Sequence, residues 1–287
     1  MAIQHIIDVK TKNLGAIEVR RVLPASKQKM VGPWIFFDHF GPVELLSGDD
    51  GINVKPHPHI NLATVTYLFQ GEIFHRDSLG NAQPILPGEI NLMVAGKGIT
   101  HSEREREELK LKNRTLHGIQ LWHALPEVFE EISPAFYNYR SDELPKFINN
   151  SGVGFKLLIG GAYGYSSPVK TYCQTLYIEV NIPRNVSIDL PIEEELAIYV
   201  IKGEIEYNKQ VINSHTMLII DSSNLYKLNA LLDSHIVIIG GDKLSHRFIE
   251  WNFVSSNKDR IKKAKDNWKN GRFKKVYGDE EEFIPLP

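Results

Sequence analysis

Hydrophobic and polar residues alternate along most of the chain, in short runs separated by turn-forming glycine, proline and asparagine. Residues 63–69 and 90–94 show this alternation clearly, and it predicts strands with one face in a core. An aromatic run at residues 34–40 lies between two Gly-Pro pairs and predicts a buried strand that ends at a turn. Strands at such short intervals predict an all-β fold of the barrel or sandwich type.

A helical pattern occurs near the C-terminus. In residues 260–269, the side chains of Ile261, Ala264 and Trp268 fall on one face, and Gly271 supplies a stop signal. The lysines of this segment are interpreted as a solvated face rather than as a nucleic-acid surface. Residues 278–287 carry apolar residues after a run of acids, and we expect this tail to dock on the body of the protein.

The second half of the chain repeats the first faintly. Residues 67–73 and 199–205 share a hydrophobic pattern, a glycine and a Glu-Ile pair, which indicates two copies of one strand–turn–strand unit. We therefore predict two domains, residues 1–135 and residues 136–287, with the helix and tail in the second. In the same frame, Asp189 and Pro191 fall where the first copy has histidines, so the second domain is expected to lack metal ligands.

Candidate metal chemistry lies in the first domain. His57 and His59 are two residues apart, and so are His101 and Glu103. Since residues i and i+2 of a strand share a face, both pairs can converge inside a barrel. Three imidazoles and one carboxylate suit a divalent transition metal such as Fe, Ni, Cu, Mn or Zn. The alternative is four unrelated loop side chains without a metal, but two pairs at strand spacing favour the metal site.

Other residues near these pairs have simpler interpretations. Gly96 and Gly98 permit positive φ or a close backbone approach just before His101. The charge run 103–112 is expected to be a solvated loop or helical turn, apart from Glu103. His39 is expected to be structural or to support the ligands rather than to be a fifth ligand, and His117 is expected to be a buried, hydrogen-bonded core histidine rather than to face the inside of the barrel.

Composition limits the classes of protein. The 287 residues are 42% hydrophobic and 24% charged, as in soluble globular proteins, and the net charge of -2 does not favour direct nucleic-acid binding. A single cysteine, Cys173, excludes an intramolecular disulfide and a cysteine-rich zinc site. Residues 1–12 lack a signal-peptide pattern, and no apolar run is long enough to span a membrane. We therefore expect a cytoplasmic protein without a membrane partner.

Several motifs resemble pirin, a two-domain family of the cupin superfamily. They cover nearly the whole chain and lie at residues 57–59, 64–68, 75–78, 95–103, 117–122, 252–256 and 278–287. The resemblance implies two packed cupin domains (jelly-roll β-barrels), of which the N-terminal one binds a single metal, usually iron. The matching ligand positions are His57, His59, His101 and Glu103. Bacterial pirins are associated with quercetin 2,3-dioxygenase activity, and animal pirin is a nuclear transcription cofactor.

One segment departs from the family pattern. Residues 60–63 read Ile-Asn-Leu-Ala here, where pirins usually read Arg-Gly-Phe-Glu, so Glu103 is the only carboxylate ligand in the motifs. The resemblance predicts a dioxygenase with Fe(II) that takes a flavonol and O₂, with Glu103 as both ligand and catalytic base. The main alternative is a non-enzymatic, metal- or redox-sensing regulatory protein that binds a protein partner. A cupin isomerase or a storage-type β protein is the second alternative.

Overall fold

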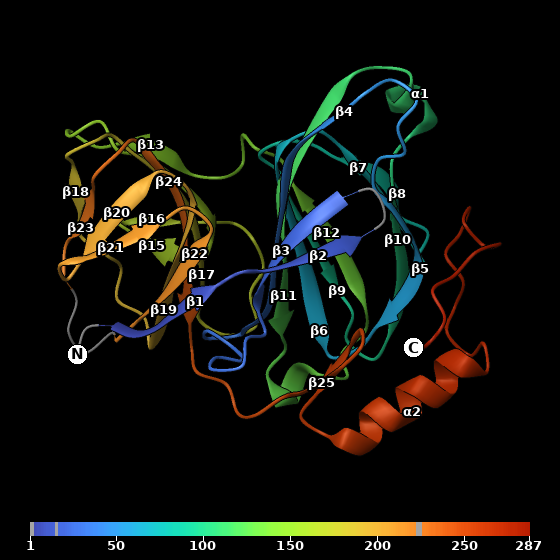
Figure 1. Cartoon of the computed structure of the whole chain (residues 1–287). Coiled ribbons are helices and arrows are strands. Elements are labelled where there is room, and N and C mark those ends of the chain that lie inside the picture. The colour runs from blue at the N-terminus through green and yellow to red at the C-terminus, as the bar shows by residue number, and fades with distance from the viewer. Residues whose placement is uncertain (1–2, 15–16, 222–225) are drawn as a thin grey trace. The chain divides into compact units, whose positions relative to one another are not determined.

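The structure, a computed structural model, describes residues 3–14, 17–221 and 226–287 and consists mainly of β-strands, which confirms the predicted all-β fold (Figure 1). The chain forms two compact units that are not continuous in sequence. Unit 1 contains Met1–Lys10, Arg20–Phe36 and Asp142–Leu244; unit 2 contains Thr11–Val19, Phe37–Ser141 and Ser245–Pro287. The main junction, at residues 141 and 142, lies close to the expected boundary at residue 135. The helix and tail, however, belong to the same unit as most of the first half.

Unit 1 has a seven-stranded and a four-stranded sheet. The larger sheet has the order β1 (Ile3–Asp8), β22 (Thr216–Ile220), β19 (Glu195–Lys202), β24 (Ser234–Gly241), β17 (Thr175–Ile182), β14 (Gly154–Ile159) and β13 (Lys146–Ile148). The smaller sheet has the order β18 (Ser187–Ile188), β23 (Leu228–Ala230), β20 (Glu204–Tyr207) and β21 (Gln210–Asn213). A small hairpin joins β15 (Gly161–Ala162) to β16 (Tyr165–Ser166). One buried cluster takes residues from both main sheets, such as Ile198 of β19 and Ile205 of β20, so the core lies between them.

Unit 2 repeats this plan. Its larger sheet has the order β12 (Ala135–Tyr139), β9 (Ile90–Val94), β6 (Leu62–Gln70), β11 (Arg114–Ala124), β4 (Trp34–Leu45), β3 (Ile17–Leu23) and β2 (Lys10–Leu14). The smaller sheet has the order β5 (Asn53–His59), β10 (Ile99–Arg104), β7 (Ile73–Asp77) and β8 (Ala82–Ile85). The short elements are β25 (Phe248–Glu250), β26 (Phe253–Ser255), α1 (Glu107–Lys110) and a 3₁₀ turn at Glu127–Phe129.

The internal repeat seen in the sequence has a structural counterpart. In unit 2 the chain leaves the larger sheet at the end of β6, turns at Gly71 with φ of 89°, and enters the smaller sheet as β7. In unit 1 it leaves β19, turns at Gly203 with φ of 97°, and enters the smaller sheet as β20. The shared glycine therefore marks the place where each chain segment passes from one sheet to the other, where a positive φ is needed.

The predicted C-terminal helix is α2, Lys258–Lys269, and the side chain of Asn257 caps its first turn. Ile261 and Ala264 are buried, as the helical periodicity predicts, and they pack with Ile60 and Phe253. The tail then runs beside β5 and β10 (Figure 1), where the backbone N–H of Ile284 donates to the carbonyl of Pro56 at 2.9 Å. The expectation that the tail docks on the body is confirmed.

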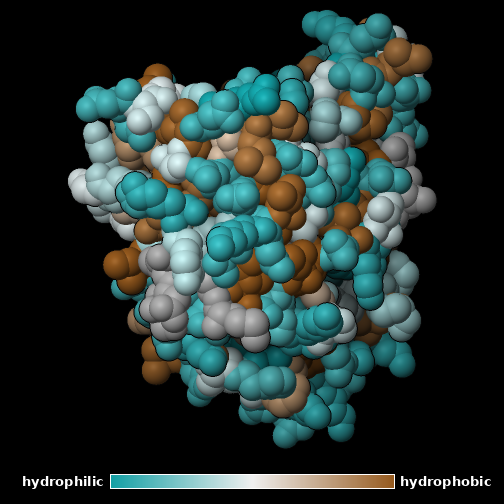
Figure 2. Space-filling model, turned by 60° about the vertical axis from the view of Figure 1, so that its left-hand side comes forward, coloured by the Kyte–Doolittle hydropathy of each residue, from teal (hydrophilic) through white to brown (hydrophobic). Residues whose placement is uncertain are grey.

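No helix among the described residues is long and apolar enough to cross a membrane. On the face drawn in Figure 2, hydrophobic residues occur in groups among hydrophilic ones. Mixed surfaces of this kind are usual for folded proteins.

The loop before β10 gives a test of the fold. A Cβ at Gly96, where φ is 48°, would lie 2.1 Å from the carbonyl oxygen of Ile132, because the neighbouring Lys97 N–H donates to that oxygen. Gly80 also has positive φ, 94°, but a Cβ there would meet nothing within 4 Å. We expect Gly80→Ala to lower the free energy of unfolding by about 1 kcal/mol, and Gly96→Ala by at least about 2 kcal/mol more. Equal losses in urea titrations would contradict this account.

Candidate metal site

The site is built by the pairing of β5 with β10. These strands are antiparallel, and His101 lies directly opposite His57. His59 follows two residues along β5, so its side chain emerges on the same face as that of His57. The pairing with β5 changes register between His101 and Glu103, where β5 has one extra residue. The strand spacing predicted from the sequence therefore holds for the histidines, while the fourth predicted ligand lies beyond an irregularity.

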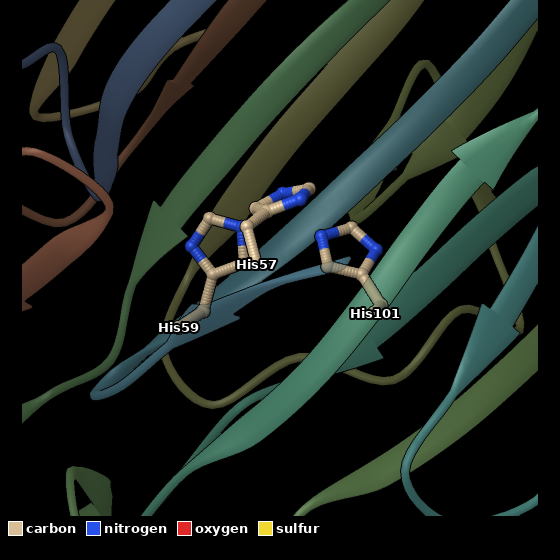
Figure 3. A group of neighbouring side chains, drawn as sticks. All are labelled: His57, His59 and His101. Atoms are coloured by element: carbon tan, nitrogen blue, oxygen red, sulfur yellow. The ribbon is translucent and has the colours of Figure 1, made fainter. Parts of the chain in front are cut away.

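Three of the predicted ligands converge in the interior of unit 2. His57, His59 and His101 are buried, and each offers one ring nitrogen such that all three lie within 4.8 Å of one another. Figure 3 shows the three rings turned toward a common region from two strands. Among the residues that the structure describes, this histidine triad is the one group of three that could hold a metal ion. Among the described residues, no such group comes from unit 1, and the expectation that the second domain lacks metal ligands stays a prediction.

Backbone carbonyls orient two of the rings. His57 Nδ1 lies 2.9 Å from the carbonyl oxygen of Lys55, and His59 Nδ1 lies 2.9 Å from that of Asn252. A carbonyl only accepts, so each Nδ1 carries the proton and each Nε2 keeps its lone pair. This arrangement is the usual one for metal-binding histidines, because a hydrogen bond to one nitrogen fixes the ring for coordination by the other.

Burial keeps the triad neutral. Desolvation lowers the pKa of His57 to about 4, and it lowers the pKa values of His59 and His101 well below their usual range. The neighbouring imidazoles lower these values further, because a second positive charge nearby would be repelled. Neutral imidazole is the form that binds a metal, so no proton must be displaced near neutral pH.

His101 provides a direct test of whether a metal fits. Its side chain is 1% exposed, and neither ring nitrogen has a hydrogen-bond partner among the described residues. Leaving a buried polar group unpaired costs roughly 1–3 kcal/mol, so such groups usually have a partner. An ion held with His57 and His59 would supply that partner, and the residues present fit a metal.

Glu103 is buried nearby, but the structure does not include it in the triad's group. Its carboxylate oxygen Oε1 lies 3.4 Å from the hydroxyl of Thr66, which also lies 2.7 Å from Oε1 of Gln120. Thr66 has one hydroxyl proton and donates it to one of these oxygens at a time. Burial raises the pKa of Glu103 to about 7. The role of Glu103 as the fourth ligand stays a prediction.

His75 and Asp77 of β7 form a buried pair near the triad that was not predicted from the sequence. His75 Nε2 lies 3.2 Å from Asp77 Oδ2, and both side chains are buried. The His75 ring is 5.4 Å from that of His101 and stacks on Phe136 at 4.5 Å between centroids. The His75–Asp77 pair is therefore part of the side-chain packing beside His101. The i, i+2 spacing of a histidine and a carboxylate on a strand was the available signal.

The remaining nearby residues lie outside the triad. His39 and His117 contact each other, with 2.8 Å between their Nε2 atoms, which agrees with their expected structural role. In the charge run, α1 forms the expected helical turn. Arg104 and Glu105 are not solvated as expected, because Arg104 pairs with Asp279 and Glu105 pairs with Arg114.

Comparison with known proteins shows to which protein family this chain belongs. The model of the pirin family matches residues 16–123, and the model of the pirin C-terminal cupin domain matches residues 177–274. A pirin-like protein of Caulobacter vibrioides is 43% identical over 99% of both chains. The chain belongs to the pirin family. As a bacterial-type pirin it consists of two cupin domains, which confirms the fold that the motifs implied.

Two further relatives carry names that refer to an activity. A Pseudomonas aeruginosa protein, named provisionally as a quercetin 2,3-dioxygenase, is 34% identical over 90% of this pirin and 80% of its own length. A crystal structure titled quercetin 2,3-dioxygenase from Acinetobacter baumannii is 29% identical, covers 100% of this pirin and 95% of the other chain, and superposes with a TM-score of 0.90. The strands that carry the triad therefore belong to the same backbone fold as the Acinetobacter baumannii protein.

The first prediction for the site concerns metal content. We expect His57→Ala and His101→Ala each to reduce the metal bound per chain at least about tenfold, because two imidazoles hold an ion far less tightly than three. His235→Ala is the matched control, since His235 pairs with Glu179 in unit 1 and should leave the metal content unchanged. Elemental analysis of the purified proteins checks this. Full metal content in both triad variants would rule out the site.

The second prediction concerns pH. Since the triad's pKa values are lowered on folding, unfolded chains bind protons below pH 6.5 that the folded protein does not. Glu103 acts in the opposite direction, because its raised pKa makes the folded protein take up one proton as the pH falls below about 7. Three imidazoles outweigh one carboxylate, so metal-free protein should lose stability as the pH falls from 6.5 toward 4. The loss should reach about 1.4 kcal/mol per pH unit for each unopposed imidazole.

Urea titrations of metal-free protein at pH 7.5, 6 and 5 measure this effect. His57→Leu removes one of the titrating groups and should flatten the dependence. A free energy of unfolding that stays constant from pH 7.5 to 5 would contradict the burial of neutral imidazoles.

Proposed function

We propose that this pirin is a metal-dependent dioxygenase that acts on flavonols such as quercetin with O₂. The observation that carries the proposal is the buried histidine triad, whose ring nitrogens converge within 4.8 Å while those of His101 have no hydrogen-bond partner among the described residues. The names of the relatives from Pseudomonas aeruginosa and Acinetobacter baumannii support the same activity and the same substrate class.

The triad would hold one divalent transition ion, with Glu103 as the fourth ligand. We propose Fe(II), the usual metal of the family that the motifs resemble; Ni, Cu, Mn and Zn also suit imidazole-rich sites. When bound, such an ion would act as a Lewis acid that favours the deprotonated hydroxyl of a flavonol and would offer open positions to substrate and O₂.

Charge in the site favours an anionic substrate. The three imidazoles are neutral because burial lowers their pKa values. With an ionised Glu103 they contribute a formal charge of about -1, so a divalent ion leaves the filled site at about +1. A deprotonated flavonol would neutralise that charge.

Glu103 is the residue we assign to proton transfer. In the metal-free protein, burial raises the pKa of Glu103 to about 7, so its carboxylate accepts a proton more readily than an exposed glutamate does, whereas a bound cation would lower that pKa. Thr66 lies 3.4 Å from Oε1 and can stabilise the ionised form by donating a hydrogen bond. Glu103 would take the proton of the flavonol hydroxyl, while the surrounding strands exclude water.

This role predicts a separation between metal binding and turnover. Glu103→Gln keeps the size of the side chain and one oxygen that can bind a metal but removes the base, so the variant should retain part of its metal and lose quercetin turnover by at least about 100-fold. Glu103→Asp retains a carboxylate and should keep more activity than Glu103→Gln. The decay of quercetin absorbance and the metal content are measured on the same preparations.

Unchanged turnover in Glu103→Gln would refute the assigned role of Glu103. Metal-loaded wild-type protein that binds quercetin stoichiometrically without consuming it would refute the dioxygenase. That second result, together with capture of a protein partner that depends on the oxidation state of the metal, would favour the regulatory alternative.

A further inference from the structure

A cavity of about 640 Å³ lies in unit 2 beneath the tail that follows α2. Strands β5 and β10 contribute Pro56 and Thr100, and the rest of the lining comes from residues 268–287. Because Thr100 precedes His101 on a strand, its side chain points to the opposite face of the sheet. The cavity is therefore separate from the histidine triad, and its volume lies in the range of small-molecule pockets.

The walls of the cavity are mainly apolar and aromatic. Trp268, Phe273, Phe283 and Leu286 line it, and the two neighbours Trp268 and Phe273 lie 5.8 Å apart between ring centroids. The indole N–H of Trp268 donates to the carbonyl of Ile284 at 3.0 Å, so the polar atom of this ring is already satisfied. The rest of the Trp268 ring offers the cavity a flat apolar surface, and such a surface suits an aromatic ligand.

A buried hydroxyl lies within this apolar lining. Thr100 is 1% exposed and lines the cavity, yet its Oγ1 has no hydrogen-bond partner among the described residues. Buried hydroxyls without a partner are uncommon, since the missing hydrogen bond costs roughly 1–3 kcal/mol. Because this oxygen is itself buried from solvent, a ligand in the cavity could reach it only after the side chain rotates.

The lining carries three lysines and three acids, but the acids are more engaged in ion pairs than the lysines. Two of the lining acids are ion-paired, because Asp279 accepts from Arg104 at 2.7 Å and Glu282 contacts Lys55 at 2.7 Å. The lysines that line the cavity outnumber the lining acids that are outside these two ion pairs. With these two partners included, five cations oppose three carboxylates: Lys55, Arg104, Lys269, Lys274 and Lys275 against Asp279, Glu280 and Glu282.

Lys269 and Lys274 form no ion pair with any residue that the structure describes. Both are exposed and line the cavity. They are therefore available to an anionic group on a ligand.

We propose that this tail cavity is a binding site for a small aromatic molecule that carries one anionic group. The aromatic part lies against Trp268 and Phe273, and the anion faces Lys269 and Lys274. This inference does not depend on the proposed reaction, because the cavity and the triad lie on opposite faces of β10.

The test uses the full chain and two fluorescent probes of similar shape. One is 8-anilino-1-naphthalenesulfonate, an aromatic anion, and the other is the neutral N-phenyl-1-naphthylamine. We expect the sulfonate to bind saturably with one site per chain. The double variant Lys269→Gln/Lys274→Gln should raise its Kd about 3- to 10-fold and leave the Kd of the neutral probe within about twofold. Lys262→Gln/Lys263→Gln, on the same helix but outside the cavity, is the matched control and should change neither.

A second variant tests the location without changing charge. Leu286→Trp fills part of the cavity and should weaken both probes at least about fivefold. Thermal unfolding confirms that each variant is folded, and the lysine pair provides an independent result because its members are exposed. Absence of saturable sulfonate binding would overturn the proposal. So would a sulfonate Kd that the lysine pair leaves unchanged, or one that the control pair changes equally.

Discussion

The antiparallel pairing of β5 with β10 is the interaction on which the candidate site depends. It places His101 opposite His57, and the period of the strand then brings His59 to the same face. Two backbone carbonyls fix the tautomer of the rings on β5. The geometry is therefore held by main-chain atoms rather than by other titrating side chains. Such a site is already organised before an ion arrives, which lowers the entropy lost on binding.

Burial gives this arrangement its chemical character. The same desolvation that lowers the pKa of His57 to about 4 raises that of Glu103 to about 7. The two effects act together, because both make the charged forms costly and leave neutral imidazoles beside a carboxylate of unusual basicity. The unpaired nitrogens of His101 are a further cost to the metal-free protein. An ion bound by the triad would give one of these nitrogens a partner, which would link metal binding to folding stability.

The parts of the structure that local periodicity encodes could be predicted from the sequence. Alternation on a strand places His57 and His59 on one face, and the glycine that ends β6 recurs at the end of β19. Contacts between residues far apart in sequence could not be predicted in this way. The carbonyl that orients His59 belongs to Asn252, 193 residues later, and the partner of Arg104 is 175 residues away. A rule based on i, i+2 spacing also cannot predict the register change before Glu103.

The division of the chain has a consequence for biosynthesis. His59 takes its orientation from Asn252, and the neighbouring Ile60 forms a bridge with Phe253 of β26. A ribosome translates all of residues 142–244, most of unit 1, before it reaches these residues. The nascent chain can therefore form the strands of the triad early, but it cannot fix the orientation of the His59 ring until residue 252 has left the ribosome. An ion bound by the triad would accordingly reach its final geometry only after Asn252 has taken its place.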